Sequence, residues 1–337
     1  MATIYDIAKR VGVSPATVSR ALNNKGYVKD EVKTQILRAA EELHYIPNAA
    51  ARSLIYKKTW TIALLLPDIS NPFFATIARG VDDAISHKGY SLIICNSDGS
   101  LHNERKHIQI LRERRVDGIV MIPSGNQLDY SNTLDLDNMP FVIVDRDPGI
   151  DSVDVVLFDD FNGAKQATEH LVGLSHQAIA IITGPRNVST GVERLRGFKH
   201  VMLAAGLQVN PGYVFEGDFR ESTGYEIGKK IVDGTSIPTA IFATNDLMAL
   251  GALTAFKESG IRIPEDIAIV GYDGIPETNR GSPSLTTVIQ PNYELGQAAG
   301  DRLIRRIENV KESRQKIVLN PRLVIRDSTA RRQTLTI

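Results

Sequence analysis

Polar and aromatic side chains stand at the ends of short apolar runs of the kind that form buried strands. Carboxylates accept hydrogen bonds from two neighbouring hydroxyls, arginine and amide groups donate to oxygens, and phenyl rings cover apolar C–H faces. The set therefore predicts a site for a small neutral sugar. Two aspartates face two arginines, and this charge balance disfavours a phosphorylated or carboxylated ligand. The predicted binding residues are Asn71, Phe73, Phe74, Asp145, Arg146, Arg194, Phe219, Asn245, Asp273 and Gln290.

The adjacent phenylalanines of SNPFFA follow the apolar run TIALLLPDI and begin a helix. Neighbouring helical residues point about 100° apart, so both rings cannot face one small ligand squarely. We expect Phe74 to stack on the ligand with Phe73 as a side wall, and Phe219 to face them.

Each polar residue also has an ordinary structural explanation. A helix cap accounts for Asp273, a surface position for Arg194 and a turn for Asn245. These alternatives stay open for each residue taken singly. Their shared placement at strand ends favours binding.

Strand-length apolar runs alternate with helix-length segments after residue 58, and the rhythm restarts at residue 178. This pattern predicts an α/β body of two doubly wound half-domains with parallel sheets and a cleft between them. In such sheets ligands bind beyond the carboxyl ends of the strands, where the predicted binding residues stand. The predicted strands are residues 61–66, 91–95, 118–122, 141–144, 178–183, 214–216, 240–243 and 267–271, and the predicted helices residues 73–87, 103–114, 192–205, 221–232 and 246–258.

The composition is typical of a soluble protein of two or three domains, with 337 residues of which 42% are hydrophobic and 23% charged. The N-terminus MATIYDIAKR carries charges where a signal peptide needs an apolar stretch, and no apolar run is long enough for a membrane span. We therefore expect a cytoplasmic protein. The single cysteine, Cys95, excludes a disulfide within the chain and a cysteine metal cluster.

Catalytic motifs are missing from the sequence. Pro67 and Pro72 stand where a dinucleotide site needs its glycine turn, and no H-E-x-x-H, G-x-S-x-G or P-loop pattern occurs. We expect no cofactor, no metal and no enzymatic activity. The alternative is a sugar-processing enzyme, and measurable turnover of ribose would support it.

Residues 1–58 form a basic head, with ten Lys and Arg against five Asp and Glu. Apolar residues at helical spacing predict helices over residues 4–11, from Pro15 after the N-cap Ser14, and over residues 30–44. Two short helices and a packing helix are typical of a helix-turn-helix unit, whose second helix enters the major groove of DNA. A small helical domain without DNA-binding activity is the alternative on these patterns alone.

The segments TIYDIAKRVGVSPATVSRALNN and YIPNAAARSL closely resemble the DNA-binding unit of the LacI/GalR family of bacterial transcription regulators. The resemblance implies that Arg20 reads a guanine and that Ala16 offers a methyl contact to thymine; a phosphate contact is the alternative for Arg20. It also implies that NAAARSL is a hinge helix and that Leu54 is a wedge inserted from the minor groove. The position after the wedge is Ile55, where several relatives carry lysine. The implied DNA-binding set is Thr3, Pro15, Ala16, Thr17, Ser19, Arg20, Asn23, Tyr45, Asn48, Ala51 and Leu54.

The body is similar to the periplasmic-binding-protein-like effector domain of the same family. The segments NPFFATIARGV, VDRD, ERLRGF, TNDLMALGA, IVGYDG and LTTVIQP carry this resemblance. Within the superfamily, the predicted binding residues together look like the ribose-binding pattern of ribose-binding proteins and ribose operon repressors. The implied domains are residues 1–46 for the helix-turn-helix, 47–59 for hinge and linker, and 60–337 for effector binding and dimerisation. The last divides into an N-subdomain of about 60–160 and 291–320 and a C-subdomain of about 161–290 and 321–330.

The resemblance implies a homodimeric repressor of a sugar-utilisation operon, released from a pseudo-palindromic operator by a neutral sugar such as D-ribose. A corepressor that strengthens DNA binding is left open, as is an effector that is another pentose, a hexose or a purine. A further alternative is a catabolite-control regulator that works with a phosphocarrier protein. A dimer is expected because the tail after PRLVIRDST is short and has no leucine heptads.

Overall fold

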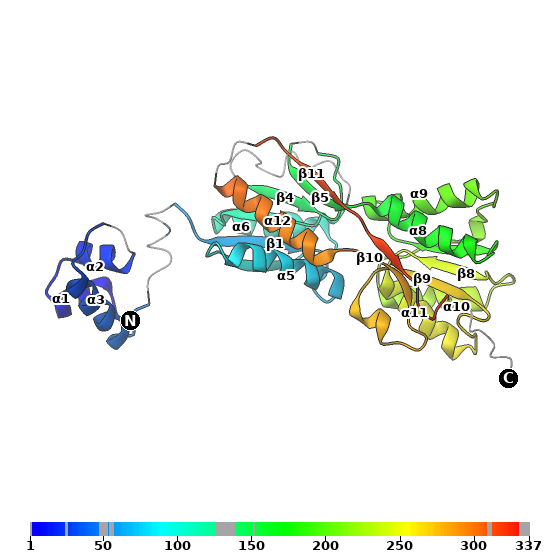
Figure 1. Cartoon of the computed structure of the whole chain (residues 1–337), viewed down its shortest axis with the longest axis horizontal. Helices are drawn as coiled ribbons and strands as arrows, with labels where there is room; N and C mark the ends of the chain where they lie inside the picture. The colour runs from blue at the N-terminus through cyan, green and yellow to red at the C-terminus, as the bar shows by residue number, and fades with distance from the viewer. Residues whose placement is uncertain are drawn as a thin grey trace. The chain divides into compact units, whose positions relative to one another are not determined.

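The protein is described by a computed structural model that covers residues 2–23, 26–46, 53, 57–125, 139–150, 152–308 and 312–329. The chain forms two compact units, Met1–Thr59 and Trp60–Ile337, here called the head and the body (Figure 1).

The head contains three helices, α1 (Ile4–Val11), α2 (Pro15–Leu22) and α3 (Asp30–Glu42). The Ser14 hydroxyl accepts the Thr17 N–H at the start of α2, as the sequence predicts, and Gly12 ends α1 with a φ of 73°. Apolar side chains from all three helices form one small core around Ile7, Val18 and Ile36. The third helix is two residues shorter than predicted, because His44 adopts a positive φ of 47°.

The body contains two sheets of six strands each. In the first sheet all neighbours are parallel, in the order β11-β5-β4-β3-β1-β2. Its strands are β1 (Thr61–Leu66), β2 (Ser91–Asn96), β3 (Gly118–Met121), β4 (Phe141–Val144), β5 (Asp154–Phe158) and β11 (Lys316–Leu319).

The second sheet has the order β12-β10-β9-β8-β6-β7 and is parallel except where β12 pairs with β10. Its strands are β6 (Ile179–Thr183), β7 (Val214–Glu216), β8 (Ala240–Ala243), β9 (Ala268–Asp273), β10 (Thr286–Ile289) and β12 (Arg322–Val324). Short 3-10 helices lie at Pro211–Tyr213, before β7, and at Pro276–Asn279, between β9 and β10.

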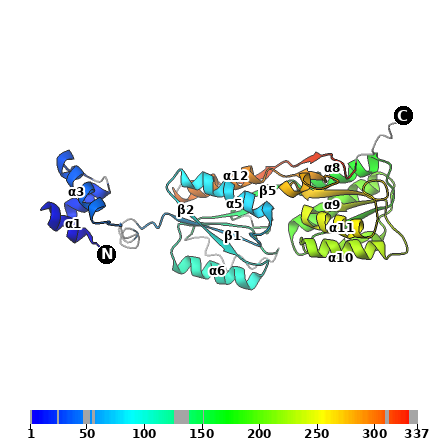
Figure 2. The same cartoon turned by 90° about the horizontal axis from the view of Figure 1, so that it is seen from below.

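Helices cover both faces of each sheet, which agrees with the predicted doubly wound fold (Figures 1 and 2). On the first sheet, α5 (Pro72–Ser86) and α12 (Asn292–Ile307) cover one face and α6 (Leu101–Glu113) covers the other. On the second sheet, α8 (Asp160–Gly173) and α9 (Ser189–Ala204) lie opposite α10 (Glu221–Val232) and α11 (Asp246–Glu258). The central strands are buried on both sides, which explains why their sequences are apolar without alternation.

The chain passes between the two sheets three times: after β5 into α8, after β10 into α12, and between β11 and β12. The sequence patterns predicted the strands β1 to β4 and β6 to β9 with small differences at their ends. They did not predict β5, β10, β11 or β12, the strands next to these crossings. No helix in the described part of the chain is both long and apolar enough to cross a membrane.

Candidate functional site

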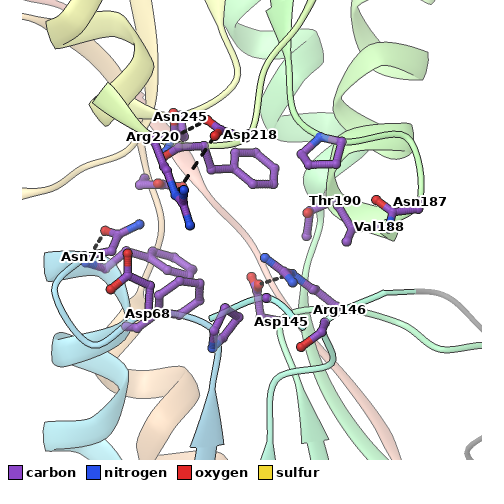
Figure 3. A pocket seen from close by; sticks show the side chains of 18 of the residues that line it. Asp68, Asn71, Asp145, Arg146, Asn187, Val188, Thr190, Asp218, Arg220 and Asn245 are labelled. Carbon is purple, nitrogen blue, oxygen red and sulfur yellow. Dashed lines mark hydrogen bonds and ion pairs between the residues drawn. The ribbon is translucent and has the colours of Figure 1, made fainter. Parts of the chain in front are cut away.

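A cavity of 420 Å³ opens at the carboxyl ends of the strands of both sheets (Figure 3). Asp68, Asn71, Asp145 and Arg146 lie on the side of the first sheet, and Asn187, Thr190, Arg220 and Asn245 face them from the side of the second. Nine of the ten predicted binding residues line it: Asn71, Phe73, Phe74, Asp145, Arg146, Arg194, Phe219, Asn245 and Asp273.

The segment after β1 contributes an amide and two rings. Asn71 caps α5, because its Oδ1 accepts the N–H of Phe73 at 3.0 Å. The Nδ2 group of Asn71 points into the cavity (Figure 3). The rings of Phe73 and Phe74 meet edge to face, with centroids 5.0 Å apart. Both rings are buried, line the cavity and also belong to the core of the first sheet, so the choice of Phe74 as the stacking ring stays a prediction.

The opposite wall is formed by Phe219, held by Asn245. Asn245 caps α11 by accepting the Met248 N–H at 3.0 Å, and its Nδ2 donates to the carbonyl of Phe219 at 2.9 Å. Asn245 is therefore a helix cap, whereas the structural alternative for it was a turn. It also gives this residue a second effect, the fixing of an aromatic wall.

Four of the cavity residues other than glycine have a positive φ, which is uncommon for residues with a side chain. The values are 56° for Asp98, 66° for Asp145, 69° for Phe219 and 111° for Asp273. Such conformations cost free energy and persist where the surrounding structure holds them, often at binding sites. Each lies at the carboxyl end of a strand or within three residues after it, where the chain turns at the cavity.

Asp145 is a buried carboxylate with spare acceptor capacity. Its Oδ2 lies 3.7 Å from Nε of Arg146, and its buried Oδ1 accepts no hydrogen bond from the described residues. Burial raises the pKa of Asp145 to about 6, and the positive charge of Arg146 opposes that rise. Arg146 is also fixed from behind, since its Nη1 donates to the carbonyl of Pro123 at 2.7 Å.

Arg194 is held by a residue that the sequence analysis missed. Its Nε donates to Oδ1 of Asp160 at 2.7 Å, and its Nη1 donates to the carbonyl of Thr244 at 2.6 Å. The guanidinium also lies 3.9 Å above the ring of Tyr272. Arg194 is only 3% exposed, so the alternative explanation of it as a surface residue is wrong.

Asp273 joins Arg194 to the segment that leaves the second sheet. Nη1 of Arg194 lies 3.4 Å from its Oδ1, and Nε2 of Gln290 donates to the same oxygen at 2.9 Å. Burial raises the pKa of Asp273 well above its usual range, which the charge of Arg194 opposes. Gln290 does not line the cavity among the described residues but supports Asp273, and its Oε1 is buried without a hydrogen-bond partner there.

Asp246 is a second residue that the sequence analysis missed. Its Oδ2 accepts the N–H groups of Gly274 and Ile275 at 2.7 and 2.9 Å, and its Oδ1 accepts the Thr287 hydroxyl at 2.6 Å. These bonds fix the turn that directly follows Asp273. Burial raises the pKa of Asp246 to about 7 despite these donors.

The predicted charge balance is wrong. Among the described lining residues five carboxylates stand against three guanidinium groups: Asp68, Asp98, Asp145, Asp218 and Asp273 against Arg146, Arg194 and Arg220. An excess of acceptors and negative charge disfavours an anionic ligand more strongly than the predicted balance did.

The head presents α2 with a polar open side. Ala16, Arg20 and Asn23 are exposed, while Val18 and Ala21 are buried in the small core. Asn23 Nδ2 donates to the carbonyl of Ser19 at 2.8 Å. The predicted DNA contacts Asn48, Ala51 and Leu54 lie outside the described residues. The remaining ones are exposed or half-buried, with Thr3 before α1, Tyr45 after α3 and the others on α2 or at its end: Pro15, Ala16, Thr17, Ser19, Arg20 and Asn23.

Comparison with known proteins accounts for nearly the whole chain. Residues 3–48 match the bacterial regulatory proteins of the lacI family, and residues 168–329 match a periplasmic binding protein-like domain. The HTH-type transcriptional repressor PurR of Pasteurella multocida is 39% identical over 98% of this chain and 100% of its own length. The chain belongs to the LacI family. The Ribose operon repressor of Halalkalibacterium halodurans is 40% identical to it over 98% of this chain and 97% of its own.

Solved structures share the architecture of this LacI-family protein. A lac repressor dimer bound to operator and the anti-inducer ONPF matches with a TM-score of 0.88 and 28% identity, over 98% of this chain and 99% of its own. A LacI family regulator from Enterococcus faecium with bound ribose matches with a TM-score of 0.73 and 33% identity, over 80% and 98%.

Family membership establishes the general function. This LacI-family protein is a DNA-binding transcriptional repressor and not an enzyme, as the sequence predicted. The helix-turn-helix head and the periplasmic-binding-protein-like body are likewise those of the family.

Proposed function

We propose that a small neutral sugar, with D-ribose as the first candidate, binds the cavity of the body and controls the affinity of this repressor for its operator. The observation that carries the proposal is a buried acceptor in the wall of the cavity. Oδ1 of Asp145 has no hydrogen-bond partner among the described residues, and a buried acceptor without a donor costs free energy.

The hydroxyls of a sugar supply the hydrogen-bond donors that the carboxylates of the cavity can accept. Each vicinal hydroxyl can donate one hydrogen bond to a carboxylate and accept one from an arginine or amide. Asp145 and Asp273 offer the acceptors, and Arg146, Arg194 and Asn71 offer donors. The rings of Phe73, Phe74 and Phe219 cover the apolar faces. The names of the ribose operon repressor and the ribose-bound relative support the choice of ribose.

The predicted mechanism follows from residues of both sheets lining one cavity. A ligand that contacts both sides favours one arrangement of the half-domains, and in a homodimer that change alters the spacing of the two heads on a pseudo-palindromic operator. By linkage, the operator must change the affinity for the sugar by the same factor. We propose that sugar binding weakens operator binding and so releases the repressor from DNA.

A purine is the second candidate effector. Relatives named PurR match the chain at 37 to 39% identity, including those of Pasteurella multocida and Photobacterium profundum. A planar purine offers fewer hydrogen-bond donors than a sugar and would leave more of the acceptors unsatisfied, which favours the sugar. The phosphocarrier-dependent alternative has no support in the described residues.

Calorimetric titration of the full chain separates these candidates. The panel is D-ribose, L-arabinose, D-xylose, D-galactose and hypoxanthine, each with the wild type, Asp273→Asn and the surface control Asp301→Asn. We expect heat with ribose, a large loss of affinity in Asp273→Asn and none in Asp301→Asn. Heat with hypoxanthine alone would show that the effector is a purine and not a sugar. Equal affinity in all three proteins would show that the ligand binds outside this cavity.

A further inference from the structure

Gly184 follows β6 directly and lies against the ring of Phe219, outside the set of residues that line the cavity. A Cβ atom at this position would lie 1.9 Å from Cζ of Phe219, 2.3 Å from Cε1 and 2.7 Å from Cε2. These distances are far below van der Waals contact, so no other residue fits at position 184 while the ring stays in place. The glycine has no positive φ that would explain it otherwise.

The backbone of Phe219 is fixed independently of the ring. Its carbonyl accepts a hydrogen bond from Asn245 at 2.9 Å, and the nearby Gly217 N–H donates to the carbonyl of Thr183 at 2.8 Å. A clash between a Cβ at position 184 and the tip of the Phe219 ring is therefore relieved by rotation of the Phe219 side chain and not by movement of the backbone after β7. Since Phe219 lines the cavity and Gly184 does not, a rotation of the ring changes the aromatic wall of the cavity.

We propose that Gly184 is a positioning residue of the effector site, because the absence of a side chain there lets the Phe219 ring pack against the end of β6 and so leaves room for a ligand. The inference rests on the proposed function only for the identity of the ligand. Gly184 itself touches no ligand and acts through Phe219.

The test is a double-mutant cycle on the full chain. Gly184→Ala is combined with Phe219→Ala, and Gly173→Ala is the control, because a Cβ at the exposed Gly173 meets no atom within 4 Å. Gly184→Ala should weaken ribose binding at least tenfold in the wild type and less than twofold in the Phe219→Ala background. Equal losses in the two backgrounds would overturn the proposal, as would unchanged affinity in Gly184→Ala. If another ligand of the panel binds in place of ribose, the cycle is run with that ligand, and only the ligand assignment fails.

A crystal structure of ligand-free Gly184→Ala decides the question even if no ligand of the panel binds. We expect a rotated Phe219 ring on an unchanged strand end, with a melting temperature close to that of Gly173→Ala. A ring that keeps its position beside the new methyl group would overturn the proposal.

Discussion

The Nε of Arg194 donates to Oδ1 of Asp160 at 2.7 Å, and both side chains are less than 10% exposed. Asp160 is the first residue of α8, directly after the chain has left the first sheet, whereas Arg194 belongs to α9 and lines the cavity. The pair therefore ties a cavity residue to one of the crossings between the two sheets. Asp273 and Gln290 make the equivalent connection to the crossing after β10.

Asp160→Ala should lower the free energy of unfolding by about 3–5 kcal/mol, because it leaves a buried guanidinium without its main partner. Glu193→Ala is the matched control, since it breaks an exposed ion pair with Arg196 on the same helix and should cost less than about 1 kcal/mol. Urea denaturation followed by circular dichroism measures both. Similar losses in the two variants would contradict the importance of the buried pair.

Sugar affinity should rise with pH. Hydroxyls donate to the ionised form of a carboxylate, so binding favours loss of the proton that burial holds on Asp145, whose pKa is about 6. Below that pH the affinity should fall by up to about tenfold per unit. Arg146, Asp160 and Arg194 face this group, and Asp273, with its raised pKa, extends the dependence to higher pH. Titration calorimetry from pH 5 to 8 gives the slope.

Asp145→Asn is the control for that slope. It should flatten the pH dependence of sugar affinity near pH 6 and leave the part of that dependence due to Asp273. An unchanged slope in Asp145→Asn would contradict the assignment.

The Asp145 carboxyl group affects the stability of the folded state in the opposite direction. Its raised pKa in the folded state gives stability that is present at pH 4 and lost as the pH rises to about 6.

Gly80→Ala should destabilise the body and weaken ligand binding together. A Cβ at Gly80 would lie 2.2 Å from the carbonyl oxygen of Tyr293, so α5 and α12 must separate. Such overpacking costs about 1–3 kcal/mol. Since α5 begins with Asn71, Phe73 and Phe74 at the cavity, its displacement also moves the binding wall. Thermal unfolding with and without ribose tests this, and stability equal to that of Gly173→Ala would contradict it.

Arg20→Ala should relax sequence preference at one base pair of the operator, with a loss of about 1–3 kcal/mol on the cognate sequence. Arg20 is exposed on α2, the helix that the sequence predicts to enter the major groove. Fluorescence anisotropy on the operator, on single-base variants and on random duplex measures the preference. A uniform loss on all duplexes would instead assign Arg20 to a phosphate.

Much of the body could be predicted from the sequence because buried parallel strands are continuous apolar runs. Residues at the ends of such runs, among them Asn71, Asp145 and Asp273, meet at one cavity as expected. The strand β5 was missed although its sequence DVVLF is equally apolar, and with it the crossing that carries Asp160. Recognition of that run would have placed Asp160 at a strand end beside the other binding residues.

Asp246 and Gln290 illustrate what local patterns do not contain. An aspartate at the start of a helix is a common and usually exposed cap residue, yet Asp246 is fully buried and holds the turn after Asp273, more than twenty residues away. Gln290, whose contact with a ligand stays a prediction, donates to Asp273 and does not line the cavity among the described residues. Both functions depend on distant segments meeting in the folded chain. The number of acidic residues that line the cavity also depends on these long-range contacts.

Operator affinity measured with and without saturating D-ribose tests the central claim most directly. The duplex is the operator selected by this protein from a random library, and the proteins are the wild type and Asp273→Asn. We predict that ribose weakens operator binding by the wild type by about 5-fold to 150-fold, the usual range of such coupling, and leaves Asp273→Asn unaffected. An operator affinity of the wild type that is unchanged at saturating ribose would contradict the account.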